Sequence, residues 1–268
     1  MLFAKNSDRP KGECQEFEWV RPRREASTQC TYISVPGHTA ETLGCWISRP
    51  TWGWGAEHGV NEHGVAVGNA TIYTITDPRP FPDALTGMDI VRLVLERSGN
   101  AATAVETLFD LISRHGQGGS GSAPGLPRRP YWSSFLIADG GSSFVIETDA
   151  AEVVVEEVSD AAAVSNRVTL GSMLPRAHPD QKIEHFVEPR LKATRHLLST
   201  GRVTVDLVKE HLRSHDQTSS GWDVCMHNDH QETAASMIVE WLPGEVVVWS
   251  TQGSPCINDY VRRTVIVR

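Results

Sequence analysis

The sequence has no hydrophobic run that approaches the ~18 residues needed for a membrane-spanning helix, so we expect no contact with a membrane. It also has no excess of basic residues, because 25 Lys and Arg stand against 33 Asp and Glu, a formal net charge of −8. A nucleic-acid-binding surface normally shows as a basic patch, so this balance argues against nucleic acid as a partner. Residues 1–20 lack the basic start and apolar stretch typical of a signal peptide.

Cysteine is scarce as well, and its five copies include no Cys-x-x-Cys pair. Zinc ribbons and thioredoxin-like sites therefore lack their signature. An odd number of cysteines without close pairs indicates reduced thiols in a cytoplasmic protein rather than a disulfide framework. The five are Cys14, Cys30, Cys45, Cys225 and Cys256.

Two common catalytic motifs are absent. The glycine-rich segment that begins at Gly116 is not followed by the lysine that a phosphate-binding P-loop requires. Gly-x-Ser-x-Gly does not occur anywhere, which argues against a serine hydrolase of the α/β type. We interpret residues 117–130, rich in Gly, Ser and Pro, as a surface loop or an active-site lid.

Hydrophobic periodicity predicts strands and helices in alternating groups. We expect strands at 30–35, 43–48 and 64–71, then helices around 88–95 and 104–112, each ended by a glycine. Strands at 132–138, 143–148 and 153–158 follow, then helices at 183–198 and 203–212, and strands at 235–242, 246–250 and 264–267. Such grouping is typical of a layered α+β protein rather than of a βαβ repeat, and we read residues 1–268 as one domain.

Asparagines after predicted strands are the first candidates for chemistry. Asn69 follows Gly-Val-Ala-Val-Gly, and Asn166 follows Ala-Ala-Val-Ser. A carboxamide fixed at the end of a strand offers an N–H donor that can stabilise a developing oxyanion. The alternative is that each simply forms a turn, and the same holds for Asn6 and Asp8 near the start of the chain.

Aromatic and metal-ligating side chains leave other interpretations open. Trp46, Trp52 and Trp54 either pack beneath a loop or form the wall of a ligand pocket. Cys225, His227 and His230, with Asp229 beside them, could hold zinc, although clustered polar loop residues are commoner than metal ligands.

A collinear series of short motifs resembles the secernin and dipeptidase group of cysteine N-terminal-nucleophile (Ntn) hydrolases. No single motif is specific for this group, but the order in which the motifs occur along the chain is. The matching segments are Lys5-Asn-Ser-Asp-Arg-Pro10, Cys30-Thr-Tyr-Ile, Arg49-Pro-Thr-Trp-Gly-Trp-Gly-Ala-Glu57, Asn61-Glu-His-Gly-Val-Ala-Val-Gly-Asn69, Gly87-Met-Asp-Ile-Val-Arg-Leu93, Gly116-Gln-Gly-Gly119, Ser134-Phe-Leu-Ile-Ala-Asp139, Val164-Ser-Asn166 and, more loosely, Val224-Cys-Met-His227 and Ser254-Pro-Cys256.

The resemblance implies a four-layer αββα sandwich and hydrolysis of small peptides or related amides by an N-terminal cysteine, with no cofactor and no catalytic metal. It implies that Asp8 orients the amine of the nucleophile, that Asn166 or Asn69 stabilises the oxyanion, and that Lys5 assists electrostatically. The substrate would contact Trp52, Trp54 and Glu57. A homo-oligomer is compatible with this reading.

The sequence departs from the family pattern in one respect, because no cysteine precedes Lys5. We therefore expect that the strand carrying the nucleophile, the first central strand, is missing and that this chain is inactive. Either the start codon is misplaced within a longer active enzyme, which we favour, or the product is a short, inactive relative. A non-catalytic interaction protein on the same fold, and a zinc protein, stay open as alternatives.

Overall fold

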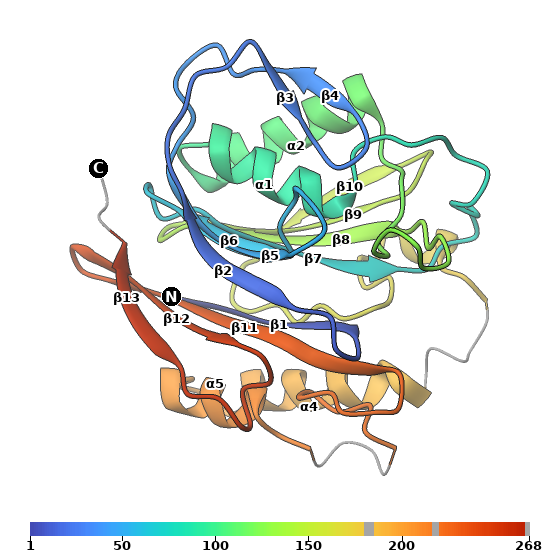
Figure 1. Ribbon diagram of the computed structural model, residues 1–268. Helices are drawn as coiled ribbons and strands as arrows, with labels where there is room; N and C mark the ends of the chain where they lie inside the picture. The colour runs from blue at the N-terminus through green and yellow to red at the C-terminus, as the bar shows by residue number, and fades with distance from the viewer. Residues whose placement is uncertain (180–184, 216–219, 266–268) are drawn as a thin grey trace.

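The chain folds into four layers. The computed structural model describes residues 1–179, 185–215 and 220–265. Two sheets face each other, and each is covered on its outer side by helices: α1 and α2 on one side, α4 and α5 on the other (Figure 1). The αββα arrangement expected from the sequence is therefore confirmed.

The smaller sheet has four antiparallel strands and begins with the first strand of the chain. Its order is β1 (Leu2–Pro10), β11 (Gln231–Leu242), β12 (Glu245–Gln252) and β13 (Val261–Val265). The long pairing of β1 with β11 joins the two ends of the sequence. β1 is an edge strand, and no described strand pairs with its outer side.

The larger sheet has seven antiparallel strands. In spatial order these are β10 (Val153–Glu157), β9 (Ser143–Thr148), β8 (Trp132–Ala138), β7 (Ala66–Ile72), β6 (His58–Asn61), β5 (Cys45–Pro50) and β2 (Gln15–Val20). A separate hairpin of β3 (Ser27–Gln29) and β4 (Ser34–Pro36) lies outside it.

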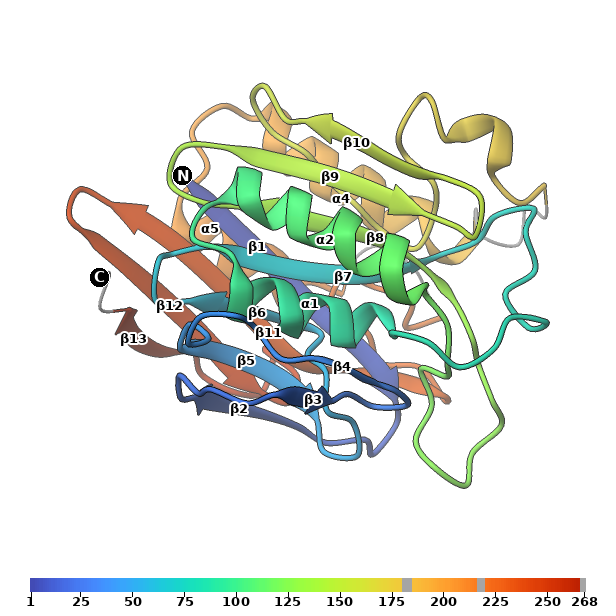
Figure 2. The same ribbon diagram turned by 90° about the horizontal axis from the view of Figure 1, so that it is seen from above.

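Helix caps define the outer layers. α1 (Gly87–Arg97) and α2 (Ala101–His115) begin at Thr86 and Asn100, whose side chains accept hydrogen bonds in capping boxes. Gly116 ends α2 with a φ of 71°, a conformation that glycine adopts readily. α4 (Glu188–Ser199) and α5 (Val205–Leu212) cover the smaller sheet, and a 3₁₀ turn, η1 (Leu174–Arg176), precedes them. Figure 2 shows α1 and α2 side by side across the seven-stranded sheet.

Hydrophobic side chains fill each space between layers. Ile47, Val67 and Leu95 belong to the cluster between the larger sheet and its helices. Phe3 and Val239 belong to the cluster between the two sheets. Alternate residues of β11 thus serve different layers, since neighbouring Ile238 packs with α5 instead.

Most predicted elements are present, with shifted ends. The prediction of a strand at 30–35 is wrong, because those residues form the turn between β3 and β4 and only the start of β4. The predicted helix at 183–198 begins outside the described residues, and the predicted strand at 264–267 ends outside them. Within the described ranges, no helix combines the length and hydropathy required to cross a membrane.

Candidate functional site

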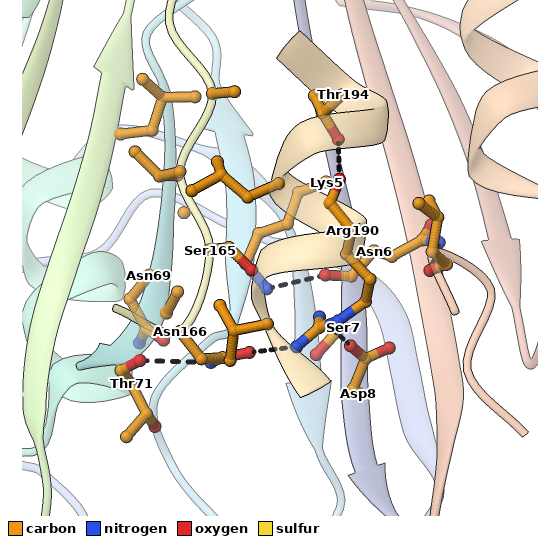
Figure 3. Close-up of a pocket in the computed structure, with 18 of the residues that line it drawn as sticks. Lys5, Asn6, Ser7, Asp8, Asn69, Thr71, Ser165, Asn166, Arg190 and Thr194 are labelled. Atoms are coloured by element: carbon orange, nitrogen blue, oxygen red, sulfur yellow. Dashed lines mark hydrogen bonds and ion pairs between the residues drawn. The ribbon is translucent and has the colours of Figure 1, made fainter. Parts of the chain in front are cut away.

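A large cavity of about 1520 Å³ runs along the outer edge of β1. Its walls come from β1, from β7, from the segment around residue 165 and from α4 (Figure 3). Residues 121–122 and 128–131 also line it. Lys5, Asp8, Asn69, Asn166 and Glu57 all line it. The structure therefore brings together five of the seven site residues predicted from the sequence.

A chain of polar contacts crosses this cavity from β1 to β7. The Arg190 guanidinium, on the first turn of α4, donates to Asp8 Oδ2 at 3.3 Å and to Asn166 Oδ1 at 3.0 Å. The Asn166 amide in turn donates to the carbonyl of Thr71 at 3.2 Å. Burial lowers the pKa of Arg190, although Asp8 acts in the opposite direction. One arginine thus fixes both the carboxylate and the carboxamide (Figure 3).

Asp8 lies within strand β1 and not in a turn, which was the alternative that the sequence left open. The pairing of β1 with β11 shifts register between Ser7 and Asp8, so that Asp8 faces Thr233 and Ala234 is the extra residue of a β-bulge. The Thr233 hydroxyl donates to Asp8 Oδ1 at 2.7 Å. Among the described residues, each carboxylate oxygen of Asp8 therefore has one donor, which leaves a lone pair for a further hydrogen bond.

Lys5 lies between the two sheets beside an acidic partner. Its Nζ is 3.9 Å from Glu57 Oε2, and Glu57 Oε1 accepts from Arg9 Nη1 at 2.9 Å. Burial lowers the pKa of the Lys5 ammonium, against the attraction of Glu57 and Asp8. Gly68 makes this approach possible, since a Cβ at that position would lie 2.7 Å from Lys5 Cδ.

The two asparagines differ from their predicted settings. Asn69 lies within β7, not at its end, and Asn166 follows no strand, because only a single bridge joins Ser165 to Arg167. Asn69 is 4% exposed, and its Nδ2 has no hydrogen-bond partner among the described residues. The Asn166 amide uses one of its two N–H bonds for Thr71. Each residue therefore retains an N–H donor.

Trp52 and Trp54, which the sequence predicted to contact substrate, are not among the described residues that line the cavity. The Trp54 ring packs against the core beneath α1, and the Arg92 guanidinium covers it at 4.2 Å from the ring centroid. The Trp52 ring lies beside Arg9, whose guanidinium carbon is 5.8 Å from the ring centroid. Both rings support the arginines of this region rather than a pocket wall.

No cysteine is among the described residues that line the cavity. Cys30 and Cys45 are buried in the core, and burial raises the pKa of the Cys30 thiol to about 12 and also raises that of Cys45. Cys14 is exposed in the turn after β1. The described residues thus bring charged and hydrogen-bonding side chains to the cavity, but no thiol.

Arg190, the residue that links the two sides of the cavity, was not predicted from the sequence. It is 182 positions from Asp8, within a helix that was predicted from hydrophobic periodicity alone. A cationic side chain on the first turn of that helix would have been a weak signal, since surface arginines are common.

His58, next to Glu57, is fully buried and neither ring nitrogen has a hydrogen-bond partner among the described residues. Burial, with a contribution from the Lys5 ammonium, holds the pKa of His58 well below its usual 6.5. The unfolded chain therefore binds a proton at His58 that the folded chain does not. Stability should fall as the pH drops below about 6.5, by up to about 1.4 kcal/mol per pH unit from this group.

Urea unfolding of the wild type and of His58→Met between pH 5 and 7.5 measures this effect. We expect the variant to have a shallower dependence of unfolding free energy on pH. Some slope remains, because burial also lowers the pKa of His211 and His227. Identical slopes for the two proteins would contradict the assignment.

The chain matches no known protein-family model. Among solved structures it is similar to a cysteine-to-alanine mutant of conjugated bile acid hydrolase from Clostridium perfringens, with 11% identity and a TM-score of 0.56 over 98% of this chain and 92% of the other. An arginine-to-leucine variant of that hydrolase gives 12% identity, the same TM-score and the same coverage. At this identity the likeness shows the fold, an Ntn-hydrolase-like αββα sandwich.

Proposed function

We propose that the cavity beside β1 is the active site of an amidohydrolase that cleaves small peptides or related amides. The nucleophile in this proposal is the first residue, a cysteine, of a strand that pairs with the outer edge of β1. The observation that carries it is the convergence of Lys5, Asp8, Asn166 and Arg190 on a cavity next to an unpaired strand edge. The similar structures are hydrolases, which supports the reaction class.

The size of the cavity supports a strand in addition to a substrate. Ligand pockets commonly measure about 300–1,000 Å³, whereas this cavity is about 1520 Å³. It follows β1 from Leu2 to Pro10, and the free N–H and C=O groups of an edge strand are ready to pair with another strand. A strand and a small amide would therefore fit side by side.

The reaction would proceed by acyl transfer. The cysteine thiol passes its proton to its own α-amine, which titrates near neutral pH, and the sulfur attacks the amide carbon. Asp8 accepts a hydrogen bond from that amine, and an N–H of Asn166 or Asn69 donates to the oxyanion. The amine proton then goes to the leaving nitrogen, the C–N bond breaks, and water hydrolyses the thioester.

The charge of the cavity favours a substrate with a free carboxylate, as small peptides have. Arg129 lines the cavity and makes no ion pair with a described residue, and Lys5 lines the same cavity. A guanidinium binds a carboxylate through two parallel hydrogen bonds. Peptides with a free C-terminus should therefore be hydrolysed faster than their C-terminal amides.

Two forms of the protein test this proposal on a panel of dipeptides. The 268-residue chain should show no turnover, and the chain joined at Met1 to the coding sequence that lies in frame upstream should show turnover that thiol reagents abolish. Replacing the added first cysteine with serine is the matched control. A folded, extended form without turnover would favour the non-catalytic interaction protein, and a stop codon directly upstream would contradict the proposed nucleophile strand.

A further inference from the structure

Four metal-ligating side chains from three segments meet beside the start of β11. His215 follows α5, Cys225 and His227 precede β11, and Cys256 lies between β12 and β13. One donor atom from each lies within 4.8 Å of those of the other three. The sequence suggested His230 in this role together with Cys225 and His227, but His230 is exposed and does not belong to the cluster.

The spacing of the donor atoms fits a tetrahedral ion. His227 Nε2 lies 3.5 Å from Cys225 Sγ and 3.1 Å from Cys256 Sγ. With Zn–S bonds of about 2.3 Å and Zn–N bonds of about 2.0–2.1 Å, tetrahedral geometry separates sulfur from nitrogen by about 3.5 Å. The ring of His215 is close as well, with its centroid 5.1 Å from that of His227. Small side-chain movements would complete the shell.

Hydrogen bonds that do not involve the four ligand side chains hold the three segments together. The Cys225 amide donates to the carbonyl of Ser214 at 3.0 Å, which fixes the residue beside His215. The Arg213 guanidinium donates to the carbonyl of Pro255 at 2.8 Å, next to Cys256. The ligands are therefore brought together by the fold, as a preorganised site requires.

We propose that His215, Cys225, His227 and Cys256 form a structural zinc site. Two sulfur and two imidazole ligands suit zinc, and four protein ligands leave no position open for substrate. On binding, both S–H groups release their protons to solvent, and two Zn–S and two Zn–N bonds form. The two thiolates balance the charge of the ion.

This site would stabilise the wall of the cavity next to β1. Cys225 is fully buried, while its neighbours Val224 and Met226 line the cavity. The Asn6 amide on β1 donates to the Val224 carbonyl at 2.7 Å. Zinc would thus connect the loop before β11, the end of α5 and the turn after β12 with the strand that carries Lys5 and Asp8.

Metal titration of the purified 268-residue chain, without an affinity tag and after chelator treatment under reducing conditions, tests the proposal. We expect one zinc per chain by elemental analysis, and with Co²⁺ the visible bands of a tetrahedral site and a thiolate charge-transfer band. His215→Gln and Cys256→Ser should each weaken zinc binding by more than the ~10–100-fold that loss of an outer hydrogen-bond partner costs. Cys14→Ser, which alters an exposed thiol elsewhere, should leave binding unchanged.

Two results would overturn the zinc site. One is substoichiometric zinc with no cobalt thiolate band, given a folded protein by circular dichroism. The other is a disulfide between Cys225 and Cys256 in protein isolated with its native thiols blocked, since oxidised cysteines cannot ligate zinc. His215 is exposed, so a folding failure of His215→Gln is not expected and its loss of affinity reports on ligation alone.

Discussion

Replacing Glu57 with alanine is expected to lower the free energy of unfolding by about 3–5 kcal/mol, the usual cost of removing one partner from a buried ion pair. Glu57 is buried, with its side chain 9% exposed, and it faces Arg9 at 2.9 Å and Lys5 at 3.9 Å, whose side chains are 10% and 17% exposed. Without Glu57, the Arg9 and Lys5 cations stay close together and lose the carboxylate that offsets their positive charge. Urea denaturation at pH 7 measures the loss.

A matched control lies on the surface of the same sheet. Glu18 accepts from Arg49 at 2.7 Å, but its side chain is 40% exposed, so Glu18→Ala should cost no more than about 1 kcal/mol. Burial alone would lower the pKa of Arg9, yet Glu57 and Glu13 together raise it. Equal losses for Glu57→Ala and Glu18→Ala would contradict the role of Glu57 as the central anion of this network.

Arg190→Ala should lower kcat/KM about 100-fold in the cysteine-bearing form proposed above, the cost of a misplacement of about 1 Å at a reacting centre. The guanidinium holds Asp8 and Asn166 in place but need not contact the scissile bond. We therefore expect kcat to fall while KM changes little. Arg190→Lys should recover only a part, since an ammonium cannot reproduce the planar guanidinium fork.

The control for Arg190 is Arg195 on the same helix. Arg195 is exposed, so Arg195→Ala should leave both kinetic constants within twofold of the parent, on the general expectation for surface substitutions. A rise in KM with kcat unchanged after Arg190→Ala would contradict this role, because it would indicate that Arg190 binds substrate rather than positions Asp8 and Asn166.

The helices over the larger sheet were predictable because local signals coincide there. α1 and α2 each combine an apolar face with a capping residue, Thr86 or Asn100, and α2 ends at Gly116. Periodicity and caps act over a few residues, so no long-range information is needed. The strands β7 to β9 were predicted for similar reasons.

The local sequence of β1 does not by itself predict a strand. Asn6 and Asp8 are typical of turns, but they lie in a strand because β11, more than 220 positions later, pairs with it and because Asn6 bonds to Leu212 and Val224. Conversely, residues 162–165 before Asn166 resemble a strand but pair with no strand among the described residues, and only Ser165 forms a single bridge. Tertiary pairing outweighs β propensity in both cases.

The candidate site likewise combines residues that local motifs predicted with residues that only tertiary packing brings together. Motifs shared with the resembled family predicted Lys5, Asp8, Asn69 and Asn166, which line the cavity, whereas Trp52 and Trp54 are not among its described lining residues. Rigid aromatic rings suit a core as well as a pocket, and Trp54 packs against a core cluster. Arg190 and Cys256 were missed because only the packing of α4 and the turn after β12 brings them near their partners. No spacing rule relates residues so distant in sequence.

Intact-mass spectrometry provides the most direct test of the proposed amide-hydrolysing site. The cysteine-bearing form is mixed with a small peptide ester, quenched in acid within seconds, and digested to locate any adduct. We expect one acyl group on the added first cysteine, greatly diminished in Arg190→Ala. No adduct on a folded protein, or an adduct on Cys14 instead, would contradict the assignment of the cavity beside β1 as an acyl-transfer site.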